Sequence, residues 1–186
     1  MSDDTVRFFG VPERLTLDDG VVIRRYVEGD IPEQVAVINA NLDHLAPWMP
    51  WAQEPVTLHT QLTFFSETEK AWDEGTGFGF GVYTVDGELV GGVGYHVRNG
   101  PGALEIGYWL ARSAEGKGLM TRVAAALTAA AATVEGVTRV EIHCDAANVR
   151  SAAIPQRLGY SLVRVEEREI ATPTECGRHL IYAIDV

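Results

Sequence analysis

A short glycine-containing segment has the clearest chemical meaning in the sequence. Glu115-Gly116-Lys117-Gly118-Leu119-Met120 lies between a stretch typical of a strand and one typical of a helix. A helix N-terminus has unpaired N–H groups and a partial positive charge, and glycines let a bound group come close to the backbone. The segment therefore suits a phosphate or diphosphate. It is neither a P-loop nor a dinucleotide fingerprint, because Thr121 stands where the latter needs a third glycine.

Two glutamates on predicted strands are candidates for acid–base chemistry. Side-chain alternation in residues 103–111 and 137–145 places Glu105 and Glu141 on the faces opposite to the apolar residues. A carboxylate on a central strand can act on a substrate. The alternative for Glu105 is a structural pair with an arginine, and the alternative for Glu141 is a solvent-exposed strand face.

His143 and Asp145 share the polar face of the second of these strands. Their spacing could suit a metal, but no third ligand is in view, so no metal site is expected. Cys144 points to the apolar face without a base nearby in the sequence. We expect it to be a buried structural cysteine and not a nucleophile.

The elements that position these residues alternate in type along the chain. Their order predicts one α/β domain over residues 1–186, with helices packed on a largely antiparallel sheet. The strand–helix–strand segment 103–145 should place two parallel strands in its middle. The predicted strands are 21–27, 78–85, 88–98, 103–111, 137–145, 160–168 and 178–184, and the predicted helices are 31–45, 57–74, about 119–134 and 148–158.

Two local signals make specific predictions about helix ends. Asp30 followed three residues later by Glu33 is a capping-box pattern for the first helix. Pro155 lies inside the last predicted helix, where a proline removes a backbone donor and costs about 3 kcal/mol. We therefore expect that helix to begin late, near Ser151, or to kink.

The composition excludes several classes of protein. The chain has 26 Asp and Glu against 15 Lys and Arg, a formal charge of −11, and 46% hydrophobic residues, as in an ordinary globular protein. A nucleic-acid binder needs clustered positive charge, but lysine occurs only at Lys70 and Lys117. No nucleic-acid partner is expected, and the acid excess suits a cationic partner such as an amine or a basic protein.

The sequence also predicts a cytoplasmic protein with no membrane partner. Met1-Ser2-Asp3-Asp4 is acidic where a signal peptide is basic. The longest apolar stretch, residues 123–134, is shorter than the roughly 20 residues that a membrane span needs. Two cysteines, Cys144 and Cys176, are too few for a disulfide framework, which agrees with a reducing compartment.

The glycine segment gains meaning from the residues around it. The relevant stretches are residues 45–51, 86–87, 105–110, 115–121, 140–145 and 157–160, together with Asn148 and Ser151. This pattern resembles the GNAT acetyltransferases, and most of all the RimJ/RimL type, which acetylates protein N-terminal amines. The resemblance covers nearly the whole chain. It implies a mixed, mostly antiparallel sheet with helices on both faces and two splayed central parallel strands, between which acetyl-CoA binds.

The resemblance implies a binding site for acetyl-CoA (coenzyme A), with the glycine segment at its diphosphate. Glu115 departs from the Gln or Arg of the family pattern and puts a carboxylate beside the diphosphate unless its side chain turns away. Arg112, Lys117 and Arg122 could supply compensating charge. The residues implied to bind acetyl-CoA are Trp109, Leu110, Ala111, Gly116, Lys117, Gly118, Leu119, Met120, Thr121, Asn148 and Ser151.

Acetyl transfer needs a neutral amine, a polarised carbonyl and a proton for the leaving thiolate. The resemblance makes Glu105 the first candidate for the base, or for positioning a water, and Glu141 the second. Ser151 matches a serine near the sulfur that could donate a proton, although it could also be a helix cap. Many GNAT enzymes have a tyrosine acid four residues before Gly159, but Pro155 stands there in this chain.

The acceptor is the least determined part of the prediction. At pH 7 roughly a tenth of an α-amine is neutral, against about one part in a few thousand of a lysine amine, so an α-amine needs only a weak base. The resemblance places Trp48 and Trp51 near the acceptor, and Tyr95 could join them. The two tryptophans could equally have only a structural role in packing the hydrophobic core.

The leading hypothesis is an enzyme that transfers acetyl to a protein N-terminal amine, for example of a basic ribosomal protein, by direct attack in a ternary complex. One alternative is acetylation of a small-molecule amine, such as an antibiotic or a metabolite. The other is a non-catalytic acyl-CoA sensor, in which Glu105 has no chemical role. Relatives often form homodimers through their C-terminal strands, but nothing in the sequence fixes the oligomeric state.

Overall fold

One eight-stranded sheet runs through the protein. The computed structural model describes residues 5–186, so the acidic residues 1–4, on which the signal-peptide argument depends, lie outside the described part. In spatial order the strands are β1 (Arg14–Thr16), β2 (Val22–Arg25), β3 (Gly77–Tyr83), β4 (Leu89–His96), β5 (Ala103–Leu110), β6 (Arg139–Asp145), β8 (Arg178–Asp185) and β7 (Ser161–Glu167). Neighbouring strands are antiparallel except β5 and β6, which confirms the predicted sheet.

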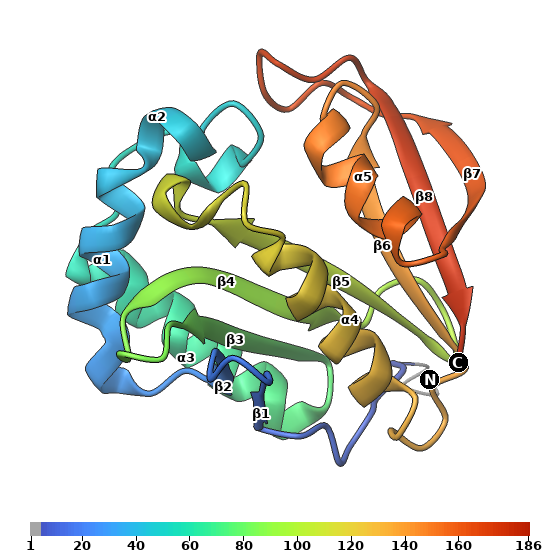
Figure 1. Cartoon of the computed structure of the whole chain (residues 1–186), viewed down its shortest axis with the longest axis horizontal. Coiled ribbons are helices and arrows are strands. Elements are labelled where there is room, and N and C mark those ends of the chain that lie inside the picture. The colour runs from blue at the N-terminus through green and yellow to red at the C-terminus, as the bar shows by residue number, and fades with distance from the viewer. Residues whose placement is uncertain (1–4) are drawn as a thin grey trace.

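Helices cover both faces of this sheet. They are α1 (Ile31–Ala40), α2 (Leu42–Leu45), α3 (Leu58–Glu74), α4 (Leu119–Ala131) and α5 (Val149–Arg157). Figure 1 shows α3 behind the sheet and α4 in front of it. The predicted helix 31–45 is divided at Asn41, while the predicted cap of the next helix is confirmed, because Thr57 accepts a hydrogen bond from the N–H of Thr60. Within residues 5–186 no helix is both long and apolar enough to cross a bilayer.

Alternating glycines on β3 let α3 lie close to the sheet. A Cβ atom added to Gly79 would lie 2.7 Å from Cγ2 of Thr68 in α3, nearer than any real side chain could be. Trp72 of α3 also donates a hydrogen bond from Nε1 to the carbonyl of Gly79, at 3.2 Å. This packing fixes the N-terminal half of the sheet, on which β4 and β5 are built.

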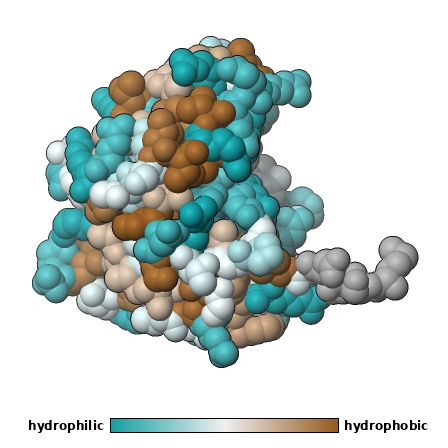
Figure 2. All heavy atoms as spheres, turned by 90° about the vertical axis from the view of Figure 1, so that its right-hand side faces the viewer, coloured by the Kyte–Doolittle hydropathy of each residue, from teal (hydrophilic) through white to brown (hydrophobic). Residues whose placement is uncertain are grey.

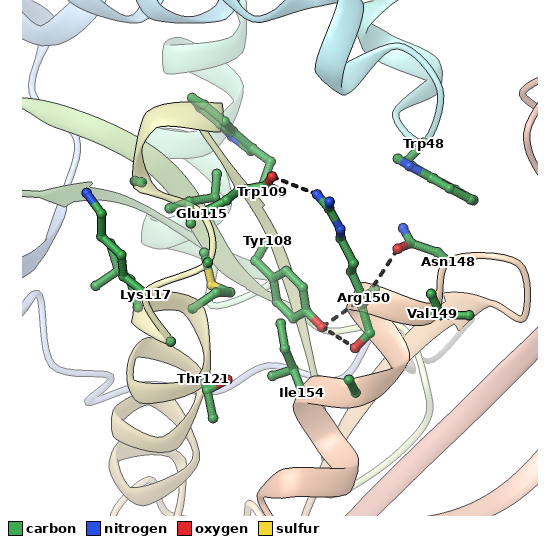
Figure 3. A pocket seen from close by; sticks show the side chains of 18 of the residues that line it. Trp48, Tyr108, Trp109, Glu115, Lys117, Thr121, Asn148, Val149, Arg150 and Ile154 are labelled. Atoms are coloured by element: carbon green, nitrogen blue, oxygen red, sulfur yellow. Dashed lines mark hydrogen bonds and ion pairs between the residues drawn. The ribbon is translucent and has the colours of Figure 1, made fainter.

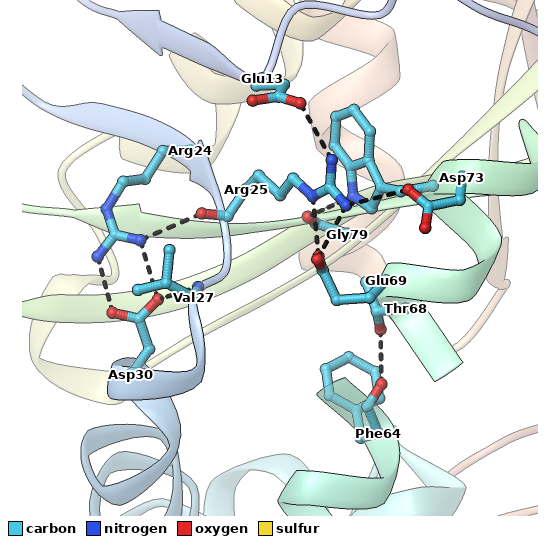
Figure 4. A network of polar contacts seen from close by, with 11 residues as sticks. Glu13, Arg24, Arg25, Val27, Asp30, Phe64, Thr68, Glu69, Asp73 and Gly79 are labelled. Carbon is cyan, nitrogen blue, oxygen red and sulfur yellow. Dashed lines mark hydrogen bonds and ion pairs between the residues drawn. The ribbon is translucent and has the colours of Figure 1, made fainter. Parts of the chain in front are cut away.

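Asp30 does not cap α1 with its side chain, so the capping-box prediction was wrong. Its carboxylate pairs with both terminal nitrogens of Arg24, at 2.7 and 2.9 Å, and accepts a hydrogen bond from the N–H of Val27 (Figure 4). Glu33 accepts a hydrogen bond from the N–H of Leu89 instead. A guanidinium on the adjacent strand competes well for the carboxylate because both partners are charged.

The parallel strands β5 and β6 are joined only at their first residues. Residues 103–105 are in register with residues 139–141, and the pairing ends there. Beyond that point β5 continues to pair with β4, and β6 continues to pair with β8. The opening between residues 106–110 and residues 142–145 is called the split below. It confirms that the central parallel strands separate.

Tyr95 belongs to the core, so its prediction as an acceptor residue was wrong. Its side chain is 1% exposed and packs edge-on against Phe78 and Phe80. Its hydroxyl donates a hydrogen bond to the carbonyl of Leu127 in α4. The alternation of β4 turns Tyr95 toward α4, where it cannot reach a substrate.

The C-terminal hairpin forms one edge of the sheet. Leu162, Val163 and Val165 of β7 are exposed, and Figure 2 shows hydrophobic side chains gathered on the side of the molecule where β7 lies. The loop that follows β7 reaches the N-terminal half, because the hydroxyls of Thr172 and Thr174 both donate hydrogen bonds to one backbone carbonyl, that of Pro47. Dimer formation through these strands stays a prediction.

Replacing Tyr95 by Phe should lower the free energy of unfolding by about 1 kcal/mol, because it removes one buried hydrogen bond and keeps the ring packing. Urea unfolding followed by circular dichroism measures the change. The Michaelis constant for an amine acceptor should stay as in the wild type. A Michaelis constant that rises while stability is unaltered would return Tyr95 to the acceptor site.

Candidate functional site

A cleft of about 1090 Å³ opens between three parts of the chain that are distant in sequence. One wall comes from α2 and the loop after it, the second from the end of β5 and the glycine segment, and the third from α5 (Figure 3). The split brings these parts together, since β5 leads to the glycine segment and β6 leads to α5.

The structure brings most of the predicted acetyl-CoA residues into this cleft. Ala111 does not line the cleft and is 4% exposed. Trp48 also lines the cleft, whereas Trp51 packs edge-on against Trp109 with ring centroids 6.1 Å apart and is not part of the lining. The predicted residues that line the cleft are Trp109, Leu110, Gly116, Lys117, Gly118, Leu119, Met120, Thr121, Asn148 and Ser151.

The glycine segment opens the N-terminus of α4 to the cleft. Gly116 and Gly118 have φ angles of +75° and +70°, and a Cβ atom on either would meet no atom within 4 Å. No side chain caps α4, although a helix leaves the N–H groups of its first turn without partners inside the helix. Uncapped N–H groups beside open space form a site for an anion.

Distant acids neutralise two of the three basic side chains around this segment. Arg112 pairs with Asp43 at 2.8 Å, and Arg122 pairs with Asp19 at 2.5 Å. Within residues 5–186 Lys117 has no acidic partner, and its Nζ donates only to a backbone carbonyl at 3.3 Å. Of the three residues expected to offset a diphosphate, Lys117 is the one whose charge is unpaired here.

Glu115 spans the cleft and does not turn away from it. One carboxylate oxygen lies 3.3 Å from Nε2 of His44 in α2, and the other accepts a hydrogen bond from Arg150 of α5 at 2.8 Å (Figure 3). Arg150 thus offsets the negative charge that departs from the family pattern. Because Arg150 is 78% exposed, this ion pair is weak and can be exchanged for another anion.

Pro155 creates a hydrogen-bonding site that Tyr108 fills. The helix α5 begins at Val149 and continues through Pro155, so the predicted late start was wrong. Pro155 has no N–H to donate to the carbonyl of Ser151, four residues earlier. The hydroxyl of Tyr108 donates to that carbonyl at 3.2 Å and lies 3.1 Å from Oγ of Ser151 (Figure 3). Asn148 caps the same helix, accepting from the N–H of Ser151 at 3.1 Å.

Burial keeps the hydroxyl and the thiol near this point protonated. It raises the pKa of Tyr108, and the hydrogen bond with Ser151 reverses only part of the rise. Burial also raises the pKa of Cys144 to about 11, against the opposing effect of a hydrogen bond with Ser151. The hydroxyl of Tyr108 is therefore protonated at neutral pH, and Cys144 is not a thiolate.

Glu105 lies where the split begins, outside the lining of the cleft, and Arg98 occupies its carboxylate. It accepts hydrogen bonds from both Nε and Nη2 of Arg98, and from Asn99 at 3.1 Å. Burial would raise the pKa of Glu105, but Arg98, the charge of His143 and Asn99 outweigh it and lower the pKa to about 2. So acidic a carboxylate is a poor base. The geometry favours the structural pair with arginine, and a catalytic Glu105 stays a prediction.

Glu141 is also buried, so its strand face is not the solvent-exposed one that the sequence left open. Its Oε2 lies 2.7 Å from Nε2 of His143. Asp145 has other partners, since it accepts hydrogen bonds from the N–H groups of Cys176 and Gly177 and ties the loop before β8 to β6. His143 and Asp145 therefore have separate partners.

Tyr108 and Arg150 are the residues at this site that sequence reasoning missed. A signal for Tyr108 exists in Pro155, because a proline inside a helix leaves the carbonyl four residues earlier in need of a donor. Nothing in the sequence links Arg150 with Glu115, since they belong to different elements that only the fold brings together.

Comparisons with known proteins agree with this geometry. Residues 21–161 match the family model of the acetyltransferase (GNAT) domain. The chain is 27% identical over 146 residues to YdaF of Bacillus subtilis, whose name is putative ribosomal N-acetyltransferase, and the alignment covers 77% of this chain and 79% of YdaF.

Solved structures share the fold over nearly the whole chain. RimL, a ribosomal L7/L12 α-N-protein acetyltransferase in complex with coenzyme A, superposes with a TM-score of 0.83 at 20% identity, covering 95% of this chain and 97% of RimL. RimJ of Mycobacterium smegmatis, in complex with a CoA disulfide, has a TM-score of 0.82 at 22% identity. The superposition covers 98% of this chain and 88% of RimJ. The microcin C7 self-immunity acetyltransferase MccE, in complex with acetyl-CoA and AMP, has a TM-score of 0.84 at 19% identity. The superposition covers 94% of this chain and 97% of MccE.

The lowered pKa of Glu105 makes its contribution to stability dependent on pH. The carboxyl has a pKa of about 2 in the folded chain against an ordinary 4.5, so its contribution is present above pH 4.5 and is lost as the pH falls toward 2. Glu105→Gln should therefore be less stable than the wild type by about 2 kcal/mol at pH 7, with a difference that shrinks below pH 4.5. Urea unfolding from pH 7 to 3.5 measures this, with the exposed Glu135→Gln as control. A difference independent of pH would contradict the Arg98 pairing.

Proposed function

The chain belongs to the GNAT acetyltransferases, and we propose that it transfers the acetyl group of acetyl-CoA to the N-terminal α-amine of a protein, with a basic ribosomal protein as the leading acceptor. The observation that carries this proposal is the uncapped N-terminus of α4, which opens through Gly116 and Gly118 onto a cleft that Tyr108 and Ser151 also line. The similarity to YdaF and RimL, both named for acetylation of ribosomal proteins, supports the choice of acceptor.

The residues at α4 fit the diphosphate of acetyl-CoA. The N–H groups of its first turn have no capping side chain, and the space beside Gly116 and Gly118 is open. Lys117 has no acidic partner in the described chain, and Arg150 is exposed and can leave Glu115 for a phosphate. The cleft volume of about 1090 Å³ is sufficient for a nucleotide with a long arm.

Tyr108 and Ser151 can supply the proton that the reaction needs on its leaving side. Bound acetyl-CoA would supply an activated acetyl thioester. Tyr108 keeps its hydroxyl proton because burial raises its pKa, and Oγ of Ser151 lies 3.1 Å away. One of the two hydroxyls can therefore donate a proton to the departing sulfur. The other can then return a proton to the donor. Pro155 supports this pair, since it leaves the Ser151 carbonyl free to hold the hydroxyl of Tyr108.

An α-amine suits this site better than a lysine. A neutral fraction of roughly a tenth at pH 7 means that the enzyme need not remove a proton before each attack. The net charge of −11 favours encounters with basic proteins. Trp48, which lines the cleft near α2, can contact the residue that follows the amine.

A panel of acceptors tests this function. The chain is incubated with acetyl-CoA and a lysine-free peptide carrying a free α-amine, the same peptide with a blocked α-amine and one internal lysine, a polyamine and an aminoglycoside. Released thiol and peptide mass are measured. Thiol release and a gain of one acetyl group are expected for the free α-amine peptide only.

The other outcomes separate the alternatives. Thiol release with the polyamine or the aminoglycoside, and not with the peptides, would support a small-molecule acetyltransferase. Binding of acetyl-CoA without thiol release for any acceptor would support a non-catalytic acyl-CoA sensor. A chain that does not bind acetyl-CoA at all would overturn the proposed site.

The glycine segment can be tested by binding alone. Gly118→Val should raise the dissociation constant of acetyl-CoA more than tenfold, because the added side chain enters the open space beside the first turn of α4. Gly87→Val is the matched control, since Gly87 also has a positive φ, of +87°, and open space, but lies in the β3–β4 hairpin. Both changes cost about 1–2 kcal/mol of stability. Equal affinities of the two variants, measured by calorimetry, would contradict this placement of the diphosphate.

A further inference from the structure

One carboxylate lies in the cleft to which the proposed function assigns the phosphate groups of acetyl-CoA. Glu115 immediately precedes Gly116 in the glycine segment, and both residues line the cleft. Its Oε1 lies 3.3 Å from Nε2 of His44 in α2, and its Oε2 accepts a hydrogen bond from Nη1 of Arg150 in α5 at 2.8 Å. The carboxylate is therefore an anion of the chain itself, held between two walls of the cleft.

The charge of the other residues in the cleft makes this carboxylate an exception. Among the described residues, Glu115 is the only acidic side chain that lines the cleft, although the formal net charge of the chain is −11. The first turns of α4 and α5 line it as well, and a helix N-terminus carries a partial positive charge. The basic side chains in the lining are Lys117, Arg122, Arg150 and Arg157. The cleft thus suits an anionic ligand, and Glu115 opposes such a ligand from within.

Arg150 is weakly held in the chain without a ligand. It is the second residue of α5, and the helix dipole disfavours a cation in the first turn. Figure 3 shows its side chain extending from α5 toward Glu115. Because Arg150 is 78% exposed, this ion pair contributes little to stability. Glu115 accepts from one nitrogen of the guanidinium, whereas a phosphate group can accept from two. A phosphate is therefore the stronger partner for Arg150.

Glu115 has contacts on the side of α2 that do not involve Arg150. The N–H of Arg112 donates a hydrogen bond to Oδ1 of Asn41 at 2.9 Å, and the N–H of Glu115 donates to the carbonyl of Arg112 at 3.2 Å. These bonds hold the backbone before the glycine segment against α2, with His44 beside the carboxylate. If Arg150 turns away, Glu115 keeps this neighbour and stays in the cleft.

We propose that Glu115 is an internal competitor for the phosphate groups of acetyl-CoA. In the free chain its carboxylate occupies Arg150. On binding of the cofactor, Arg150 exchanges this carboxylate for a phosphate, and Glu115 remains beside His44. The proposal rests on the proposed function.

The exchange lowers the affinity for the cofactor without distinguishing its two forms. Acetyl-CoA and the product CoA carry the same phosphates, so the cost of separating Arg150 from Glu115 is the same for both. The pair can form again when CoA leaves, which favours release of the product. Because the effect does not depend on the acetyl group, it can be measured with CoA alone, without turnover.

The first test is the dissociation constant of CoA for Glu115→Gln, measured by calorimetry on the full chain. It should fall about fivefold, because the variant frees Arg150 and removes a negative charge from the cleft. Glu135→Gln is the matched control, since Glu135 is exposed and lies outside the cleft lining, and it should bind CoA as the wild type does. Weaker binding by Glu115→Gln would mean that the carboxylate supports the segment, and would overturn the proposal.

The second test places Arg150→Gln in the wild type and in Glu115→Gln. The dissociation constant of CoA should rise about threefold in the wild type and about tenfold in Glu115→Gln, because only in the wild type does Arg150 first leave a partner. Arg139→Gln is the matched control, since Arg139 is an exposed arginine that pairs with Asp185 at 3.0 Å outside the cleft lining. Equal factors in the two backgrounds would show that Arg150 does not change partner, and would overturn the proposal.

A second ligand identifies the phosphate. If Arg150→Gln also weakens the binding of 3′-dephospho-CoA, the diphosphate is the partner of Arg150, and if it weakens only that of CoA, the 3′-phosphate is. Either result supports the exchange. An unchanged affinity of Arg150→Gln for CoA overturns it, even if Glu115→Gln does not fold. A wild type that binds CoA but acetylates no amine would refute the proposed function and leave this test intact.

Discussion

The short parallel pairing of β5 with β6 is the constraint on which the rest of the site depends. Three residues of each strand are in register, and after Glu105 and Glu141 the strands separate. The separation persists because each strand is paired on its other side, β5 with β4 and β6 with β8. Backbone groups along the split have no neighbouring strand to bond, so they are free to bond a ligand in the cleft. The cleft is lined by both Tyr108 and Trp109, which point to opposite faces of β5, whereas Glu105, Glu141 and His143 lie outside its lining.

A hydrogen bond between Tyr108 and Ser151 links β5 to α5 across this split. A proline inside a helix ordinarily weakens it, because a carbonyl loses its partner. In α5 that carbonyl belongs to Ser151, and the hydroxyl of Tyr108 satisfies it. The same contact holds the two hydroxyls 3.1 Å apart at the cleft. The loss of one backbone hydrogen bond in the helix thus holds these two hydroxyls together at the cleft.

The charges of the site are arranged as pairs between distant elements. Arg112 and Arg122 are engaged by acids outside the glycine segment, and Glu115 is engaged by Arg150. Of the three basic residues around the segment, Arg112, Lys117 and Arg122, the two arginines are therefore neutralised by ion pairs. At the proposed diphosphate site this leaves the uncapped backbone N–H groups of α4 and the side chain of Lys117, and Arg150 offsets the carboxylate at the first position of the segment.

Local signals in the sequence were enough to predict the order of the strands from β2 onward, the position of the glycine segment and the parallel pair, but they missed the three-residue strand β1. Periodicity, turn residues and helix-end signals act over a few residues, so they can be interpreted without the fold. They could not determine which side chains meet. The sequence predicts Tyr95 as an acceptor residue, yet the alternation of β4 places it against α4. It leaves Glu105 open as a base or as the partner of an arginine, and only the fold shows that Arg98 pairs with it and lowers the pKa of that carboxyl. Asp30 pairs with Arg24 and not with its own helix. Whether a carboxylate is a base, a cap or a counter-ion depends on the charges within a few ångströms of it, and those charges come from distant elements that meet only in the folded chain.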